Sequence, residues 1–507
     1  MTNRRQFLQA SAAWASLQAM GQASAQTASN YKAIVCVFLA GGNDTFNTVL
    51  TTDDESWAAY ESVRSLGTSP IALKKVGTAP VASAANGSPE RLGGVLPLSP
   101  ITALAGGRAL ALHPNLTRLQ DLFNTQRRLA VIANVGPLIQ PVTKAQVVAI
   151  AQGRAGSSQG ISLPPKLYSH NDQQSAWQAM GAEGATQGWG GRLVDAYVPA
   201  GTQPGYYGAI SVAGSSVWLA GQRVRPYQLS PGGPVVMGNY NATTGTSSIY
   251  GSGPLADAIR RIASNGMAGS GAAGKPRMGH VLMADLGTVS ERSIQAEALL
   301  TKAFKDNPVT DKPLGPPSRL QYSGTTVNGL ATQLQAVARV IAARSTLGAG
   351  RQVFFVQMGG FDTHDNQNVQ HADLMARLDH ALGYFDETLG LLGVQNQVTT
   401  FTASDFGRTF TSNGDGTDHG WGAHHFVLGG AVRGGQVYGR VPKLAPKNAN
   451  NNSFDGSDDQ LGNGVLLPST SVEQLGATLA KWFEVPQPGQ VFTNLARFAS
   501  ADLGFMG

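Results

Sequence analysis

The chain has 507 residues, of which 42% are hydrophobic and only 13% are charged, with a formal net charge of +6. Its 63 glycines and 26 prolines indicate long ordered loops around a large core rather than a disordered chain. Because no run of lysine and arginine occurs, the charge predicts no binding to nucleic acid or to a membrane surface. We therefore expect one α/β domain with insertions.

The first 25 residues resemble an export signal. Residues 3–8 (NRRQFL) are similar to the twin-arginine motif, and a weakly apolar stretch and the small-residue pattern Ala23-Ser24-Ala25 follow them. This order predicts a signal peptide at 1–25, passage through the twin-arginine export machinery, and a periplasmic or secreted protein. No other segment has the roughly 18 apolar residues that a membrane span needs, so no integral membrane segment is expected in the mature chain.

A first buried strand is predicted at residues 34–39 (IVCVFL), because a continuous apolar run suits a strand covered on both faces. The run ends at Gly41 and Gly42, which permit a tight turn and place Asp44 beyond the carboxyl end of the strand. Open α/β sheets bind ligands at that edge, so Asp44 is a candidate metal ligand. A turn or helix-cap role explains Asp44 equally well at this stage.

The middle of the chain adds a candidate nucleophile and an insertion. A helix is predicted over 114–123 and a buried strand over 129–135. Ser169 then precedes another helix, where its hydroxyl could attack a phosphate or sulfate ester if a metal lowered its pKa, or could simply cap the helix. The Gly-, Ser-, Thr- and Val-rich stretch at about 197–276 predicts a β-rich insertion.

Two later strands end in polar loops of the same kind. Residues 353–356 (VFFV) are followed by a double glycine, Asp362 and His364, and then by a helix that ends near Gly393. Residues 398–402 lead into a glycine-rich loop, and three of the nine histidines lie within seven residues there. The polar residues of this loop are Asp405, Arg408, Asp415, Asp418, His419, His424 and His425.

This recurrence of strand, acidic loop and helix predicts a doubly wound, mostly parallel sheet. Since parallel strands end on one side, Asp44, Asp362 and Asp405 are expected at the same edge. Carboxylate and imidazole together suit one or two divalent ions such as zinc, manganese or calcium. The alternative is a polar loop whose side chains satisfy one another.

Near the C-terminus, Thr470 and Glu473 predict a capping box for a helix over residues 472–483. The polar residues 448–459 predict a loop, because they lack the ligand spacing of a calcium-binding hand.

Seven segments carry a family resemblance: FLAGGNDTFN, LHPNLTRLQDLF, YSHNDQQSAW, GGFDTHDNQ, SDFGRT, TDHGWGAHHFVLGG and LLPSTSVEQLGATLAKWF. Together they resemble, nearly end to end, the exported bacterial family filed as domain of unknown function 1501. That family looks like a branch of the alkaline phosphatase and sulfatase superfamily, whose members are two-metal hydrolases of phosphate or sulfate esters. The resemblance implies an alkaline phosphatase-like domain over 31–507 that hydrolyses a small-molecule or polymer ester.

The resemblance also implies roles for single residues. Asp44 looks like the first metal aspartate, and Asp405 resembles the aspartate of the second metal. Asp362 and His364 resemble the aspartate–histidine pair of one metal. The remaining implied residues are His419 as the late metal histidine, His424 as a substitute ligand, Ser169 as the nucleophile, and Arg408 as the group that stabilises developing charge.

Phe406 stands where a histidine ligand is common, and the cysteine that sulfatases oxidise has no counterpart, because Cys36 lies within a predicted strand. These departures favour a second interpretation, in which a non-catalytic exported protein retains the fold to bind a partner or a surface polymer.

Overall fold

The computed structural model describes residues 30–154, 156, 160–199, 205, 207–234, 239–241, 246–248, 252–255, 257–258, 293, 296–310 and 312–507. The predicted signal peptide at 1–25 and part of the predicted insertion at about 197–276 lie outside these residues.

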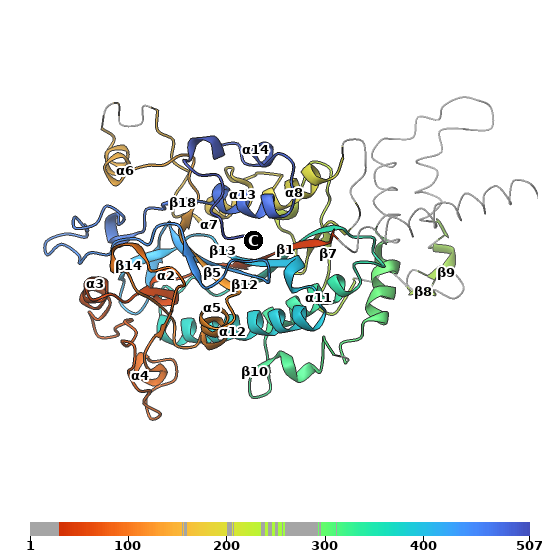
Figure 1. The fold of residues 1–507 in the computed structure, drawn as a ribbon, viewed down its shortest axis with the longest axis horizontal. Coiled ribbons are helices and arrows are strands. Elements are labelled where there is room, and N and C mark those ends of the chain that lie inside the picture. The colour runs from red at the N-terminus through yellow and green to blue at the C-terminus, as the bar shows by residue number, and fades with distance from the viewer. Residues whose placement is uncertain are drawn as a thin grey trace, which may run out of the picture.

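A nine-stranded, mostly parallel sheet forms the centre of the described structure, in the order β17-β5-β16-β13-β1-β12-β6-β7, with β18 beside β5 (Figure 1). Its strands are β1 (Lys32–Leu39), β5 (Leu129–Gly136), β6 (Ala209–Ser211), β7 (Tyr227–Gln228), β12 (Arg351–Met358), β13 (Val398–Ser404), β16 (Ala423–Leu428), β17 (Gln436–Tyr438) and β18 (Thr470–Ser471). Only β16 runs antiparallel to its neighbours among these strands. The predicted α/β class with a mostly parallel sheet is confirmed.

Helices cover both faces of the sheet (Figure 1). One layer comprises α5 (Thr117–Asn124), α11 (Gly329–Ala342) and α12 (Gln367–Leu391), and the other comprises α7 (His170–Ala179), α8 (Trp189–Tyr197), α13 (Val472–Trp482) and α14 (Pro488–Val491). Successive residues of β1 point to opposite layers: Val35 and Val37 pack with the first, whereas Cys36 and Phe38 pack with the second. Burial on both faces explains the continuous apolar run of this strand.

Smaller elements surround this core. The smaller helices are α2 (Thr45–Thr48), α3 (Asp54–Arg64), α4 (Pro89–Leu92) and α6 (Lys144–Ala151). A small sheet comprises β2 (Val49–Thr51), β3 (Leu96–Pro97) and β4 (Leu110–Leu112). Three two-stranded sheets comprise β8 (Asn239–Asn241) with β9 (Thr246–Ser248), β10 (Gln321–Ser323) with β11 (Thr326–Val327), and β14 (Arg408–Ser412) with β15 (Thr417–His419). Short 3-10 helices occupy Ala105–Gly107, Val217–Leu219, Pro317–Leu320, Gln395–Gln397, Gly462–Gly464 and Leu495–Arg497. Of the predicted insertion, the described parts supply β6 and β7 to one edge of the main sheet and form the β8–β9 pair.

The predicted capping box of the C-terminal helix was wrong by one residue. Ser471 is the N-cap of α13 and exchanges hydrogen bonds with Gln474. Thr470 belongs to β18 and donates its hydroxyl to the carbonyl of Ala133 at 2.9 Å. Glu473 instead accepts hydrogen bonds from Asn494. The tertiary contacts of Thr470 and Glu473 therefore override the local pattern.

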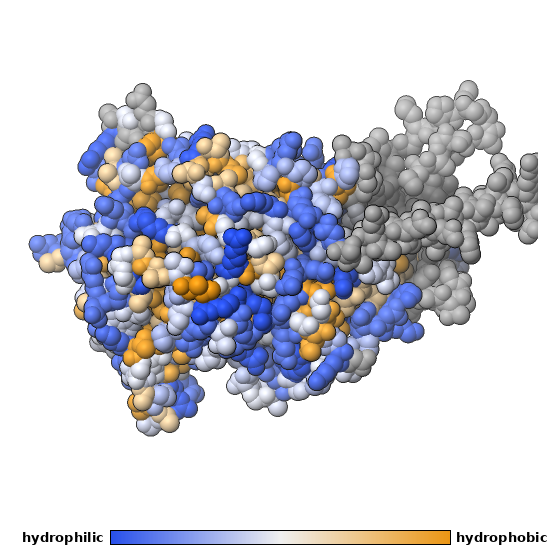
Figure 2. Space-filling model, viewed as in Figure 1, coloured by the Kyte–Doolittle hydropathy of each residue, from blue (hydrophilic) through white to orange (hydrophobic). Residues whose placement is uncertain are grey.

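Hydrophobic residues on the face shown in Figure 2 lie in small groups among hydrophilic ones. This distribution is expected when the apolar residues of a sheet are enclosed between two helical layers. Within the described part of the chain, no helix combines the length and the apolar character needed to cross a membrane.

The three central strands end together. Leu39 of β1 pairs with Met358 of β12 and with Ser404 of β13 in parallel register. The loops after these strands therefore leave the same edge of the sheet. Gly41 allows them to approach closely, because its φ is +118° and a Cβ there would lie 2.4 Å from the backbone nitrogen of Asp362.

Candidate metal centre

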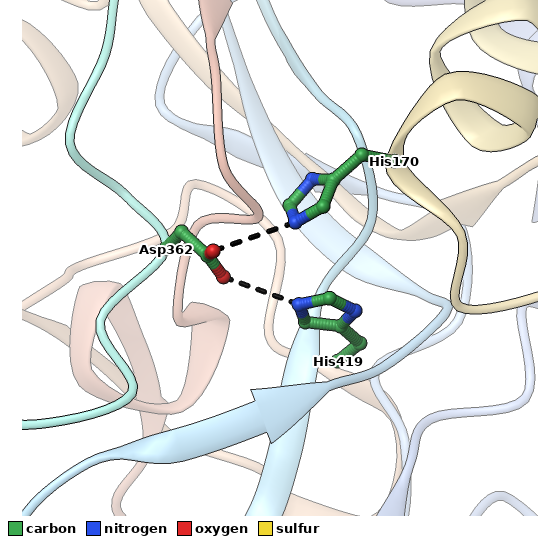
Figure 3. Close-up of side chains that lie close together, drawn as sticks. All are labelled: His170, Asp362 and His419. Carbon is green, nitrogen blue, oxygen red and sulfur yellow. Dashed lines mark hydrogen bonds and ion pairs between the residues drawn. The ribbon is translucent and has the colours of Figure 1, made fainter.

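His170, Asp362 and His419 converge at this edge, each offering a ligand atom within 4.8 Å of the others (Figure 3). Asp362 follows β12, His170 is the first residue of α7, and His419 ends β15. The carboxylate of Asp362 places Oδ2 3.5 Å from Nε2 of His170 and Oδ1 3.2 Å from Nε2 of His419. His364 extends the group, because its Nε2 lies 3.0 Å from both Asp362 Oδ1 and His419 Nε2.

The second nitrogen of each imidazole faces an oxygen that can only accept a hydrogen bond. The contacts are His170 Nδ1 to Asp405 Oδ2 at 2.6 Å, His419 Nδ1 to the carbonyl of Tyr168 at 2.8 Å, and His364 Nδ1 to Asp418 Oδ1 at 3.3 Å. A neutral ring with its hydrogen on Nδ1 presents the lone pair of Nε2 to Asp362, and this is the tautomer that a metal ion bound at Nε2 requires. Three lone pairs and a carboxylate repel one another, and a cation among them removes that repulsion.

The spacing of these atoms fits a single small ion. Ligand atoms bound about 2.0–2.1 Å from a tetrahedral zinc ion lie about 3.3 Å from one another. The contacts from Asp362 to the three rings and the contact between His364 and His419 range from 3.0 to 3.5 Å, and the ligand atoms of His170, Asp362 and His419 all lie within 4.8 Å of one another. The oxygen or backbone partner at each Nδ1 is also the arrangement that orients histidine ligands in known metal sites.

Charges around the centre favour the ionised form of Asp362 and act on His170 and His419 in opposite directions. Burial alone would raise the pKa of Asp362, but Arg408 and the nearby histidines outweigh burial and hold this pKa below its usual value. Arg408 Nη1 donates to Asp362 Oδ1 at 2.7 Å. The hydrogen bond to Asp405 raises the pKa of His170, whereas burial lowers the pKa of His419.

Phe406 forms a wall of the centre. Its ring centroid lies 4.8 Å from the ring of His170 and 4.5 Å from that of His419. Gly42 packs against the same ring, because a Cβ on Gly42 would lie 2.4 Å from a ring carbon of Phe406. Phe406 thus holds two imidazoles of the centre in place by packing.

Two predicted aspartate ligands are engaged outside this group. Asp44 is fully buried, and its carboxylate accepts hydrogen bonds from Arg64 at 2.5 and 3.0 Å and from Gln367 at 2.6 Å, while it caps α2. Asp405 is also fully buried; it accepts from the backbone of Gly41 at 3.2 Å and from Gln174 at 3.0 Å, besides His170. Asp405 therefore supports a ligand, whereas Asp44 ties the first turn to Arg64.

The other predicted site residues are placed as follows. His424 is buried in β16, its Nδ1 accepts the backbone N–H of Asn134 at 3.0 Å, and burial lowers its pKa to about 4. Ser169 stands at the N-cap position of α7 without capping it, and donates its hydroxyl to Asp172 at 2.9 Å. Arg408 reaches the centre through Asp362.

Sequence reasoning missed His170 as part of the group. Ser169, one residue earlier, was the candidate at this helix start, because a hydroxyl there matches a familiar nucleophile position. The available signal was the spacing of His170 and Gln174, which places both on one face of α7 toward Asp405. That spacing is common in helices, so it indicates a site only once the position of Asp405 is known.

The fold and the site together define an α/β protein with a histidine-rich candidate metal centre at the carboxyl edge of its parallel strands. Residues 321–458 match the model of a family described as "Protein of unknown function (DUF1501)". The predicted resemblance to this family is thereby confirmed over a segment that contains Asp362, His364, Asp405 and His419. His170 lies outside the matched segment. No curated protein matches the chain.

Proposed function

We propose that this protein is an exported, metal-dependent hydrolase of phosphate or sulfate esters with an alkaline phosphatase-like architecture. The observation that carries the proposal is the convergence of three imidazole Nε2 atoms on Asp362 while every Nδ1 is held by an acceptor. Such a donor set, at the edge where α/β sheets bind ligands, is typical of metal centres.

The geometry supports one ion rather than the two of the superfamily. Asp44 and Asp405 are the carboxylates expected at a second ion, yet both are fully buried and hydrogen-bonded to protein groups. The imidazole-rich set His170, His364 and His419 favours zinc or manganese over calcium, because calcium prefers six to eight oxygen ligands.

The chain leaves the centre open to a substrate. The side chains of Asp362 and His364 are 43% and 42% exposed, as expected for a catalytic rather than a closed structural site. A divalent ion here would polarise an ester oxygen and activate water for attack. Asp405 fixes the ring of His170, the carbonyl of Tyr168 fixes His419, and Arg408 fixes the carboxylate of Asp362.

A second candidate function is binding of a partner or surface polymer without catalysis. Phe406 favours this alternative, because it fills with an apolar ring a position at which a two-metal hydrolase uses a histidine. The two functions differ in whether the metal-loaded protein turns over an ester.

The test is metal analysis of the mature protein together with hydrolysis of aryl phosphate and sulfate esters. We expect about one zinc or manganese ion per chain, and at least about a 100-fold loss of metal affinity and activity in His170→Gln. His380→Gln is the matched control, because His380 lies on α12 and contacts Asn328 instead. A metal-bound protein that hydrolyses no ester would leave the binding function, and unchanged metal affinity in His170→Gln would refute the centre.

A further inference from the structure

We infer that the proposed metal centre acts on esters with a single negative charge, namely phosphodiesters or sulfate monoesters, in preference to dianionic phosphate monoesters. This inference rests on the proposed function and specifies its substrate class. Three features of the described residues carry it: a committed arginine, an acidic rim, and a lysine whose charge is already matched.

The arginine at the centre does not reach the substrate side. The side chain of Arg408 has 0% exposure. Its Nη1 donates to Asp362 and to the carbonyl of Gly41, its Nε donates to the hydroxyl of Thr417, and its Nη2 donates to the carbonyl of Thr417. Arg408 therefore holds Asp362 and the surrounding loops, and it supplies no exposed positive charge for a second phosphate oxygen.

The loops that carry His364 and His419 also carry three further aspartates, Asp365, Asp415 and Asp418, which we call the acidic rim. Asp365 is exposed and directly follows His364. Asp418 is exposed and contacts Nδ1 of His364 at 3.3 Å. Asp415 accepts the backbone N–H of Asn366 at 3.0 Å. The loops at 359–368 and 404–422 contain five aspartates and one arginine, so their net charge is strongly negative.

Lys166, the lysine that precedes His170 in the sequence, is paired with two carboxylates. Lys166 precedes His170 by four residues, in the turn before α7, and its side chain is 69% exposed. Its Nζ lies 3.7 Å from Asp172 and 3.9 Å from Glu183. One lysine with two carboxylates gives this group a net charge of +1 − 2 = −1, so it offers no surplus positive charge to a dianionic substrate.

The field of these charges discriminates between substrates by charge. Like charges repel in proportion to their product, so a dianionic phosphate monoester meets about twice the repulsion that a phosphodiester or a sulfate monoester meets. Partly exposed charges within about 8–10 Å are only partly screened at physiological ionic strength. One imidazole-bound divalent ion neutralises less substrate charge than two ions do.

The experiment compares three p-nitrophenyl esters at pH 8: the phosphate monoester, its methyl diester and the sulfate. We expect kcat/KM to favour one of the two monoanionic esters in the native protein, and the diester and sulfate arms identify which. Asp365→Lys is expected to raise the kcat/KM of the phosphate monoester relative to the preferred ester by about three- to tenfold. Asp365→Asn should give a smaller change in the same direction.

The control is Asp54→Lys, because the side chain of Asp54 is 99% exposed on α3 and lies outside the rim. This variant should leave the ratio unchanged. Metal content and thermal unfolding of each variant establish that the centre is intact. A native preference for the monoester, or a ratio that neither Asp365 variant changes, would overturn the inference and leave the proposed function standing. A metal-loaded protein inactive on all three esters would overturn both.

Discussion

At this centre, the direction in which a ring nitrogen faces matters more than the presence of a histidine. When His170 is neutral with the hydrogen of Nδ1 directed to Asp405, its Nε2 faces Asp362 with a bare lone pair. His424 shows the opposite arrangement, because its Nδ1 accepts a backbone N–H and the hydrogen of the neutral ring must then be on Nε2. In these tautomers, Nε2 of His170 has a lone pair available for a cation, whereas Nε2 of His424 carries a hydrogen.

Ser169 is the residue whose role is most easily separated from that of the metal centre. Its hydroxyl donates to Asp172 in the same helix, so its hydrogen is directed away from the ligand group. We expect Ser169→Ala to retain at least about a tenth of the ester hydrolysis, since water rather than this hydroxyl is the proposed nucleophile. Steady-state kinetics on an aryl ester measures this, with Ser175→Ala as a control within the same helix. A loss of about a thousandfold or more would instead assign Ser169 as the nucleophile.

At the scale of the secondary-structure elements, α5 shows a helix start that depends on another helix. Leu116 at its N-cap position provides no side-chain hydrogen bond. Asp379 of α12 accepts the backbone N–H groups of Arg118 at 3.2 Å and Leu119 at 2.9 Å instead. Burial raises the pKa of Asp379 to about 6, against the effect of these hydrogen bonds. The contact joins two helices of one layer, so it stabilises both the start of α5 and the packing of α5 against α12.

Removing this cap should destabilise the fold. In Asp379→Ala, two largely buried N–H groups of α5 lose their acceptor, and we expect the free energy of unfolding to fall by about 1–3 kcal/mol. Denaturant titration measures the change. Glu387→Ala is the control on the same helix, because the side chain of Glu387 is 59% exposed and its ion pair with Arg319 should contribute less than about 1 kcal/mol. Equal effects of the two substitutions would contradict the capping role of Asp379.

The elements that the sequence predicts well are those whose signal is local. The strands at 34–39, 129–135, 353–356 and 398–402 are buried on both faces, so their apolar runs identify them, and a shared edge for their loops follows from parallel pairing. The contacts of Asp44 with Arg64 and of His170 with Asp405 join residues 20 and 235 positions apart. The hydrophobic periodicity of the sequence does not indicate contacts of this kind. Hence the sequence predicts the edge and several of the ligands, but not which groups complete the set.

At the scale of the whole molecule, seven of the eight histidines in the described part of the chain fall into two groups. His170, His364 and His419 line the open centre, whereas His113, His371, His424 and His425 are buried. Burial lowers the pKa of His371 to about 4 and that of His425 to about 3, and it lowers the pKa of His113 well below the usual value. The folded protein thus keeps these four rings neutral at pH values where the unfolded chain protonates them.

This difference predicts that stability falls as the pH decreases from about 6.5 through 4, because the unfolded state binds more protons over that range. Asp379, Glu473 and His170 act in the opposite sense, since their raised pKa values let the folded state take up a proton first, but the lowered pKa values of His380 and His419 add to those of the four buried rings. In His371→Gln, the slope of the unfolding free energy between pH 6 and 5 should decrease by up to about 1.4 kcal/mol per pH unit. Denaturant titrations of both proteins at pH 8, 6 and 5 measure the slopes, and the difference at pH 8 accounts for altered packing. An unchanged slope would show that the pKa of His371 is the same in the folded and the unfolded protein.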